Sequence, residues 1–179
     1  TAIIGGTGSG KTTLVNLIPR FYDVESGRVL VDGIDVHNIP QKKLRAKIGF
    51  VPQKSVLFTG TIADNLRYGK ADATKDDVIY AAKIAQADEF VSSMKDGYNT
   101  MLSEGGLNLS GGQKQRLSIA RALVRRPEIY VFDDSFSALD FKTDAKLRAA
   151  LRKETQDATV ILVAQRVGSI MDADRIIVL

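Results

Sequence analysis

The sequence predicts an α/β fold that combines a mostly parallel sheet with an inserted helical segment. Four short and almost entirely apolar runs alternate with helical patterns, as strands covered on both faces do: residues 2–4, 48–51, 129–132 and 159–163. Between residues 59 and 125 no strand pattern of comparable strength occurs, whereas helical spacing is frequent. We therefore expect a core formed by residues 1–58 and 126–179, with residues 59–125 as a helical subdomain.

Residues 5–13, with the sequence GGTGSGKTT, lie between the first expected strand and a helical pattern at residues 12–18. Gly5, Gly10, Lys11 and Thr12 satisfy G-x-x-x-x-G-K-[ST], the pattern of a phosphate-binding loop. Glycines let the backbone point N–H groups at one place, and the helix start favours an anion there. We expect Lys11 to contact the β- and γ-phosphates of a nucleoside triphosphate and the Thr12 hydroxyl to reach Mg²⁺.

The alternative is a glycine-rich turn that arose by chance, which the strand–loop–helix context disfavours. A dinucleotide fingerprint is excluded, because Lys11 stands where that motif needs its third glycine. The phosphate contacts are expected from Gly6, Thr7, Gly8, Ser9, Gly10, Lys11, Thr12 and Thr13.

Composition narrows the class of protein. A chain of 179 residues that is 44% hydrophobic suffices for one compact domain with a subdomain. No apolar run approaches the roughly 20 residues that cross a bilayer. Because cysteine is absent, disulfides and thiolate metal sites are excluded. The chain begins at the phosphate loop and ends in the apolar run 176–179, so we expect an excerpt of a longer polypeptide.

The mild net charge of +4 does not indicate a nucleic-acid partner. Lys42, Lys43, Arg45 and Lys47 are interspersed with apolar residues and lack the aromatic side chains that stack on bases, so we interpret them as a solvated face. His37 is the only histidine, and we expect an ordinary loop residue without metal-ligand partners.

The remaining elements follow from local patterns. Residues 28–33 read as a strand that ends in the tight turn Asp32-Gly33, from which residues 34–36 return. The pattern Thr74-x-x-Asp77 predicts a helix N-cap. Helices are expected at residues 41–46, 64–68, 76–87, 88–94 and 140–153, and apolar residues on one helix face at Val78, Ala81, Ala82 and Ala85.

Two further motifs carry chemistry. Ile129-Tyr130-Val131-Phe132-Asp133 places a carboxylate after a buried strand, where Asp133 can orient Mg²⁺. Leu109-Ser110-Gly111-Gly112-Gln113 reads first as a capping box, in which Ser110 and Gln113 begin a helix that runs to about residue 124. A capping box does not require two glycines, which lower helix propensity. Bare N–H groups suit a phosphate, and a second such loop far from Lys11 suggests a nucleotide held between two protomers.

The combination of GGTGSGKTT, Gln53, LSGGQ at residues 109–113, IYVFDD at 129–134 and SALD at 137–140 resembles the nucleotide-binding domain of ABC transporters. Exporter-type members are similar in further stretches, at residues 21–23, 51–53, 58–62 and 103–106. The resemblance implies a P-loop NTPase with a RecA-like core and a helical signature subdomain. It also implies ATP and Mg²⁺ as cofactors, head-to-tail pairing with a second nucleotide-binding domain, and a transmembrane domain, so that the chain lies at the cytoplasmic face of a cell membrane. The residues implied to bind the partner-held nucleotide are Ser110, Gly111, Gly112 and Gln113, and those implied to contact Mg²⁺ are Thr12, Gln53 and Asp133.

Two departures from the family pattern bear on catalysis. The family's catalytic glutamate corresponds to Asp134 and its switch histidine to Gln165, while Gln53 keeps the family's residue. Aspartate is shorter by roughly 1.5 Å, and a misplacement of that size costs about 10²-fold in rate. Glutamine cannot carry the charge of an imidazolium. The hypothesis is a slow, degenerate ATP site, as in one half of a heterodimeric exporter, whose LSGGQ completes a competent site on another chain; the alternative is that both variants are tolerated.

Other interpretations remain open at this level. One is a soluble ABC-type ATPase of DNA repair or translation, although residues 53–110 lack the heptads of a DNA-repair coiled coil. The apolar run Val56-Leu57-Phe58 either packs inward or lies at the cleft that receives a helix of the transmembrane domain.

Overall fold

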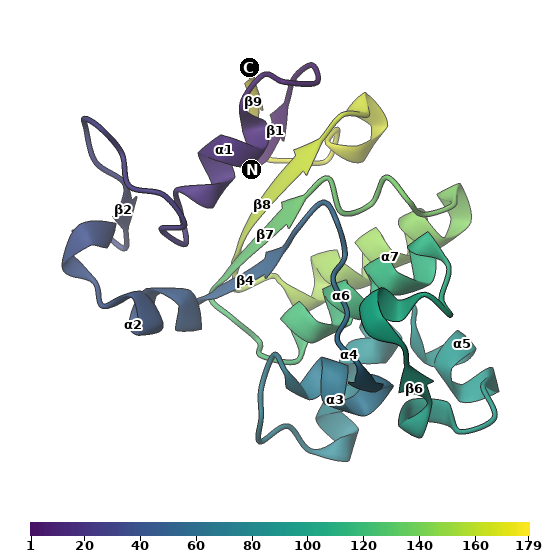
Figure 1. Ribbon diagram of the computed structural model, residues 1–179. Helices are drawn as coiled ribbons and strands as arrows, with labels where there is room; N and C mark the ends of the chain where they lie inside the picture. The colour runs from purple at the N-terminus through teal and green to yellow at the C-terminus, as the bar shows by residue number, and fades with distance from the viewer. The chain divides into compact units, whose positions relative to one another are not determined.

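The computed structural model describes residues 1–179 and divides into two compact units (Figure 1). The first unit comprises Thr1–Phe50, Pro127–Asp134 and Ala158–Leu179, and the second comprises Val51–Arg126 and Ser135–Asp157. This grouping assigns residues 51–58, 126 and 135–157 differently from the predicted subdomains. The predicted division into 1–58 with 126–179, and 59–125, stays a prediction.

The sheet of the first unit has five strands in the order β4-β7-β8-β1-β9. Their bounds are Ala2–Ile4 (β1), Ile48–Val51 (β4), Ile129–Asp133 (β7), Thr159–Ala164 (β8) and Ile176–Val178 (β9). The pairs β7–β8, β8–β1 and β1–β9 are parallel, which confirms the predicted α/β fold (Figure 1). The sequence shows the apolar run at residues 176–179, but no strand was predicted there, so β9 is new in the structure.

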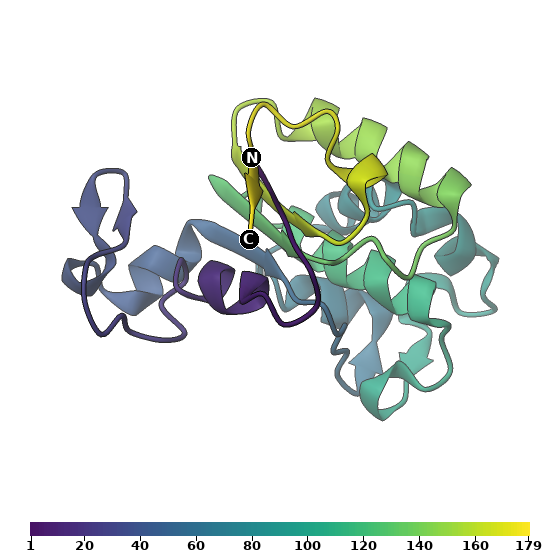
Figure 2. The same cartoon turned by 90° about the horizontal axis from the view of Figure 1, so that it is seen from above.

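Helices and a hairpin complete the first unit. Helix α1 (Lys11–Asn16) contacts β7 and lies along the sheet in Figure 2, and α2 (Gln41–Ala46) follows as predicted. Strands β2 (Leu30–Val31) and β3 (Ile34–Asp35) pair antiparallel through Asp32 and Gly33, whose φ values of 53° and 77° give the expected tight turn. Short 3₁₀ turns occupy Val36–Asn38 and Val167–Ser169. One core cluster consists of Ile3, Val15, Val31, Val36, Leu44, Ile48, Val131 and Val163, and a second of Ala2, Ala164 and Ile170.

His37 differs from the expectation of an ordinary loop residue. It lies in the 3₁₀ turn, and its ring nitrogens lie 3.2 Å from an Asp23 oxygen and 3.1 Å from an Asp35 oxygen. The contact with Asp23 joins residues far apart in sequence, so spacing alone does not reveal it. No group of three or more His, Cys, Asp and Glu side chains is arranged to hold a metal ion anywhere in residues 1–179.

The second unit is mainly helical. It contains α3 (Ile62–Arg67), α4 (Lys75–Ile84), α5 (Asp88–Ser93), α6 (Gly111–Leu123) and α7 (Phe141–Glu154), with 3₁₀ turns at Gly97–Asn99 and Glu104–Gly106. Thr74 and Asp77 form the predicted capping box, and Val78, Ala81, Ala82 and Ala85 are buried as expected. Two strands of two residues each, β5 (Gly60–Thr61) and β6 (Met101–Leu102), pair where no strand was predicted. No helix in the structure has the length and apolar composition needed to cross a membrane.

A close backbone contact fixes the end of α3 against α6. A methyl group at Gly69 would lie 2.1 Å from the Arg121 carbonyl oxygen and 2.9 Å from a Val124 methyl group. Neither neighbour is a flexible side-chain end. Only glycine fits at this position.

We expect Gly69→Ala to lower the free energy of unfolding by about 1–3 kcal/mol, because the two helices must separate to admit the added methyl. Urea unfolding measures this loss. Gly168→Ala is the matched control, since an added methyl there meets no atom within 4 Å. Equal losses of unfolding free energy in the two variants would show that the close contact between Gly69 and α6 does not determine the effect of the added methyl group.

Candidate functional site

The loop between β1 and α1 combines one tightly enclosed glycine with several open ones. A methyl group at Gly5 would lie 2.5 Å from the Leu179 carbonyl oxygen. At Gly6, Gly8 and Gly10 an added methyl would meet no atom within 4 Å. Gly8 and Gly10 have φ values of 82° and 88°, which side chains rarely adopt. The loop therefore turns tightly and leaves space above its backbone.

Lys11 is the first residue of α1, and its side chain reaches back into this loop. Its side chain is only 7% exposed, and its Nζ donates to the carbonyl oxygens of Gly5 at 2.9 Å and Gly6 at 2.6 Å, and to Ser9 Oγ at 3.3 Å. No carboxylate forms an ion pair with it. A buried ammonium group surrounded by neutral oxygens favours an approaching anion.

Thr12 and Asp133 come together at the same place. The Thr12 hydroxyl donates to Asp133 Oδ1 at 3.2 Å, and the Asp133 side chain is 2% exposed. Burial raises the pKa of the Asp133 carboxyl and the charge of Asp134 raises it further, while the Thr12 hydrogen bond and Lys11 lower it. A hydroxyl and one buried carboxylate are ligands that suit Mg²⁺, which takes its other ligands from water and phosphate. The residues present therefore fit that ion.

Asp134 and Gln165, the two departures from the family pattern, contact each other. Gln165 Nε2 donates to Asp134 Oδ2 at 3.1 Å. The Asp134 backbone is anchored by its N–H, which donates to the Val163 carbonyl oxygen at 3.0 Å. Its φ of 46° is a conformation in which aspartate is enriched. The first unit thus brings Lys11, Thr12, Asp133, Asp134 and Gln165 to its sheet edge.

Gln53, Ser110, Gly111, Gly112 and Gln113 belong to the second unit. Gln53 is exposed. Ser110 Oγ accepts from the Gln113 N–H at 3.3 Å, and Gln113 Oε1 accepts from the Ser110 N–H at 2.9 Å, so the capping box is confirmed. Their contact with a partner-held nucleotide stays a prediction.

Gly111 and Gly112, the two glycines of the LSGGQ segment, differ in a way that sequence reasoning missed. An added methyl at Gly111 would meet no atom within 4 Å, whereas at Gly112 it would lie 3.2 Å from the Ala138 carbonyl oxygen. Gly112 is therefore explained by packing within the second unit. Gly111, which is exposed, keeps its backbone accessible.

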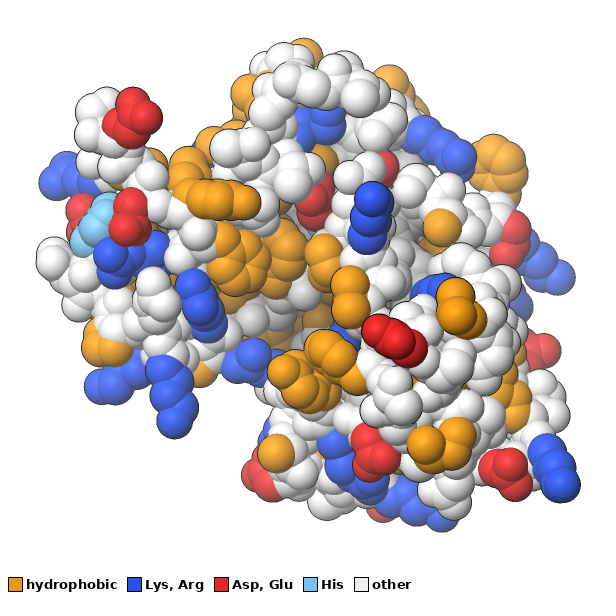
Figure 3. Space-filling model, viewed as in Figure 1, with side chains coloured by type: hydrophobic (Ala, Val, Ile, Leu, Met, Phe, Trp, Pro, Cys, Tyr) orange, Lys and Arg blue, Asp and Glu red, His pale blue; other side chains and the backbone are white.

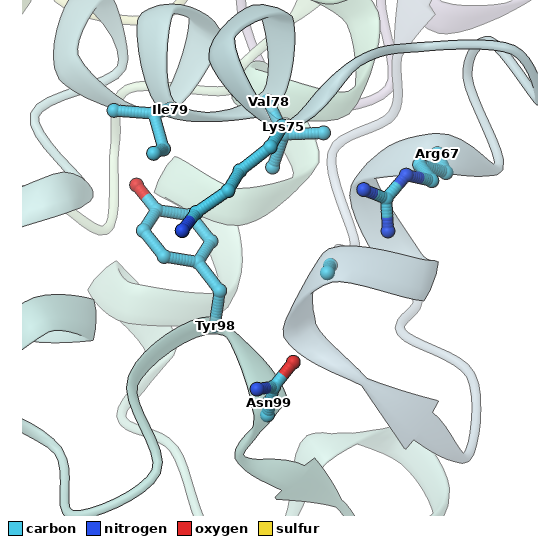
Figure 4. Close-up of a pocket in the computed structure, with 7 residues that line it drawn as sticks. Arg67, Lys75, Val78, Ile79, Tyr98 and Asn99 are labelled. Atoms are coloured by element: carbon cyan, nitrogen blue, oxygen red, sulfur yellow. The ribbon is translucent and has the colours of Figure 1, made fainter.

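Two cavities of the second unit lie away from these residues. One, of about 310 Å³, is lined by side chains of α3, α4 and the 97–99 turn, among them Arg67, Lys75 and Tyr98 (Figure 4). The other, of about 410 Å³, is polar and includes Arg116 and Lys146. None of the predicted site residues lines either cavity.

The raised pKa of Asp133 predicts a stability change without nucleotide and Mg²⁺. The unfolded chain has the ordinary carboxyl pKa of 3.8, so between that value and the raised folded one the folded state binds more protons and loses stability as pH rises. Asp133→Asn removes this loss and keeps an oxygen acceptor for Thr12. We expect Asp133→Asn to be more stable than the parent protein in urea unfolding at pH 7, by a margin that shrinks toward pH 4.

Asp35→Asn is the control with the opposite sign. The His37 backbone N–H donates to this carboxylate and lowers its pKa, so its replacement gives no gain at pH 7. A gain of the same size in both variants would contradict the role of burial at Asp133.

Comparisons with known proteins agree with this geometry. A family model described as ABC transporter matches residues 1–137. An uncharacterized ABC transporter ATP-binding protein of Mycobacterium tuberculosis is 56% identical over 181 residues, covering 99% of this chain and 31% of that protein. A putative multidrug export ATP-binding/permease protein of Bacillus subtilis is 46% identical over 178 residues, with coverage of 99% and 31%.

Among solved structures, a bacterial Atm1-family ABC exporter with ATP bound superposes with a TM-score of 0.96 at 44% identity, again covering 99% of this chain and 31% of that one. The chain therefore spans about a third of the length of the proteins it matches. With its phosphate loop, its buried Asp133 and a family match over most of its length, the chain belongs to the ABC transporter family, of which it forms a nucleotide-binding domain.

Proposed function

We propose that this chain is the MgATP-binding motor domain of an ABC exporter. The observation that carries the proposal is the enclosed Lys11 ammonium beside the Thr12–Asp133 hydrogen bond. Residues 6–13 hold the triphosphate, with Lys11 against the β- and γ-phosphates. Thr12 and Asp133 would hold Mg²⁺, which would supply positive charge against the phosphates. For Gln53 the proposal rests on the family resemblance alone, by which its side-chain amide would contact the ion or the attacking water.

Hydrolysis at this chain's own site is slow. The Asp134 carboxylate ends one methylene short of the family's glutamate, and one of its oxygens accepts from Gln165 Nε2 at 3.1 Å. An oxygen engaged in this way is less available to accept a proton from water. Gln165 can donate to a γ-phosphate but adds no positive charge there.

The signature segment acts on a second nucleotide. Ser110 and the open backbone of Gly111 complete a site whose phosphate loop belongs to a second nucleotide-binding domain, in a head-to-tail pair. In this chain Asp134 and Gln165 replace the family's catalytic glutamate and switch histidine. We propose that the partner is a different chain, which has that glutamate and histidine at its own site, so that the transporter is a heterodimer. A substitution series at the two departures tests this arrangement.

We expect Asp134→Glu with Gln165→His to raise ATP turnover at this site by about 10–100-fold, since the carboxylate regains its reach and the imidazole its charge. The assay uses the assembled transporter with the partner's own site blocked at its phosphate-loop lysine. Adding Lys11→Ala should abolish the gain. If the unsubstituted site already turns over as fast as the partner's, the degenerate-site proposal fails.

An apolar surface supports a transmembrane partner. Val56 and Phe58 are 54% and 43% exposed. The ring centroids of Phe58 and the exposed Tyr68 lie 4.6 Å apart. Figure 3 shows several such hydrophobic side chains at the surface. We propose that Val56 and Phe58 receive a short helix of the transmembrane domain, which places this chain at the cytoplasmic face of a cell membrane. A soluble ATPase of DNA repair or translation finds no support among the relatives described above, whose names are those of transporters.

Val56→Asp should lower the amount transported per ATP hydrolysed at least about tenfold. The docked transmembrane helix would bury the new carboxylate without a partner, which weakens the apolar contact between the helix and this surface. Basal ATPase activity should stay within about twofold, since Val56 touches no nucleotide in this proposal. Val56→Thr, of nearly the same shape, is the control. Unchanged coupling in Val56→Asp, measured by paired transport and ATPase assays in vesicles, would remove this surface from the interface.

A further inference from the structure

Helix α6 carries a stripe of three polar side chains, two of them buried, that the functions above do not use. Gln115, Ser118 and Arg121 are spaced by three residues and therefore share one face of the helix. Gln115 and Ser118 are 4% and 3% exposed. Burial also lowers the pKa of the Arg121 guanidinium. Polar side chains in such a place destabilise a fold unless they form hydrogen bonds.

The stripe faces the segment that follows Gln53. Ser55 Oγ donates to Gln115 Oε1. Arg121 Nη2 donates to the Val56 carbonyl oxygen at 2.6 Å and to Ser118 Oγ at 3.4 Å, and the guanidinium lies 5.5 Å from the Phe58 ring centroid. Residues 55–58 and α6 are thus joined at several points, and all of these residues lie within the second unit.

The side-chain amide of Asn65 also binds residues 55–58, and, unlike the Gln115 amide, it uses both its oxygen and its nitrogen. Asn65 of α3 accepts from the Phe58 N–H at 2.8 Å and donates to the carbonyl oxygens of Phe58 at 2.9 Å and Thr61 at 3.0 Å. Gln115 uses only its oxygen. Its Nε2 is buried and has no hydrogen-bond partner.

The unpaired Gln115 amide is informative about its role. An unsatisfied buried donor costs about 1–3 kcal/mol, and an apolar side chain of the same shape would avoid that cost. Packing alone therefore does not explain a glutamine here. What distinguishes Gln115 from an apolar residue of the same shape is its side-chain oxygen, which accepts from Ser55.

We propose that Gln115 is a positioning residue that, with Ser55, fastens the start of α6 to the segment following Gln53. Gln115 lies five residues after Ser110, roughly 7.5 Å along a helix whose first turn is closed by the capping box. A displacement at residues 53–55 is therefore transmitted to Ser110. This inference rests on the proposed function, in which Gln53 contacts this chain's nucleotide and Ser110 the partner's.

The test uses the full-length transporter with its partner. Ser55→Ala and Gln115→Leu should each lower kcat at the site that Ser110 completes by about tenfold, with KM for MgATP within about twofold. The double variant should be no slower than either single one, because both remove the same link. Ser55→Thr, which keeps the hydroxyl, should retain kcat.

Thr155→Val is the matched control, since it also removes a hydrogen-bonded hydroxyl of the second unit, one that is buried and donates to the Leu151 carbonyl oxygen at 2.8 Å. It should lower the unfolding temperature without changing kcat. A kcat for Ser55→Ala equal to that of Thr155→Val, or additive losses in the double variant, would overturn the proposal.

Amide hydrogen exchange in the nucleotide-free transporter decides the question independently of turnover. Ser55→Ala should speed exchange in residues 54–58 and in the first turn of α6 together, while Thr155→Val does neither. Faster exchange confined to residues 54–58 would overturn the link. If no sample hydrolyses ATP, the proposed function fails, and the exchange data still decide whether the two segments are joined.

Discussion

The parallel pairing of β7, β8 and β1 is the constraint on which the candidate site depends. The register aligns Asp133 with Val163 and Ile4 with Ala164, so three neighbouring strands end at one edge of the sheet. Whatever follows each strand is therefore brought to that edge: the glycine loop after β1, Asp134 after β7 and Gln165 after β8. Residues separated by more than 100 positions in the sequence meet because their strands run in the same direction.

Lys11 and Asp133, the two buried charged residues of the candidate site, differ in exposure from the ion pairs elsewhere in the first unit. Lys47 bridges Asp32 and Glu128, and Arg20 pairs with Asp23, but these groups are solvated, and water screens the attraction within such pairs. Lys11 and Asp133 are instead 7% and 2% exposed. Removing charges from water is expensive, so a fold that keeps two such groups at one edge sacrifices stability for binding.

Much of the fold followed from the sequence because its signals are local. The strands at residues 48–51 and 129–132, the helix at 41–46 and the caps at Thr74 and Ser110 depend on short-range patterns, and the structure has all of them. The pairs β5–β6 and β1–β9 were not predicted, since strands of two or three residues are defined by their partners rather than by their own composition. The packing of Gly112 on Ala138 and the buried Gln115 were missed for the same reason: each depends on a segment distant in sequence. The meeting of Asp134 with Gln165 needed the strand order, which no motif contains.

Ser110 shows how one side chain meets two chemical demands. Its oxygen accepts from the Gln113 N–H and so completes the first turn of α6, which uses only acceptor capacity. A hydroxyl keeps its own proton, which can rotate toward an acceptor outside the helix. Aspartate would cap the helix equally well, but it would bring a negative charge and no proton to that end. The stability of α6 and the proton that Ser110 offers outside the helix are therefore separable properties, and a substitution that preserves the first can eliminate the second.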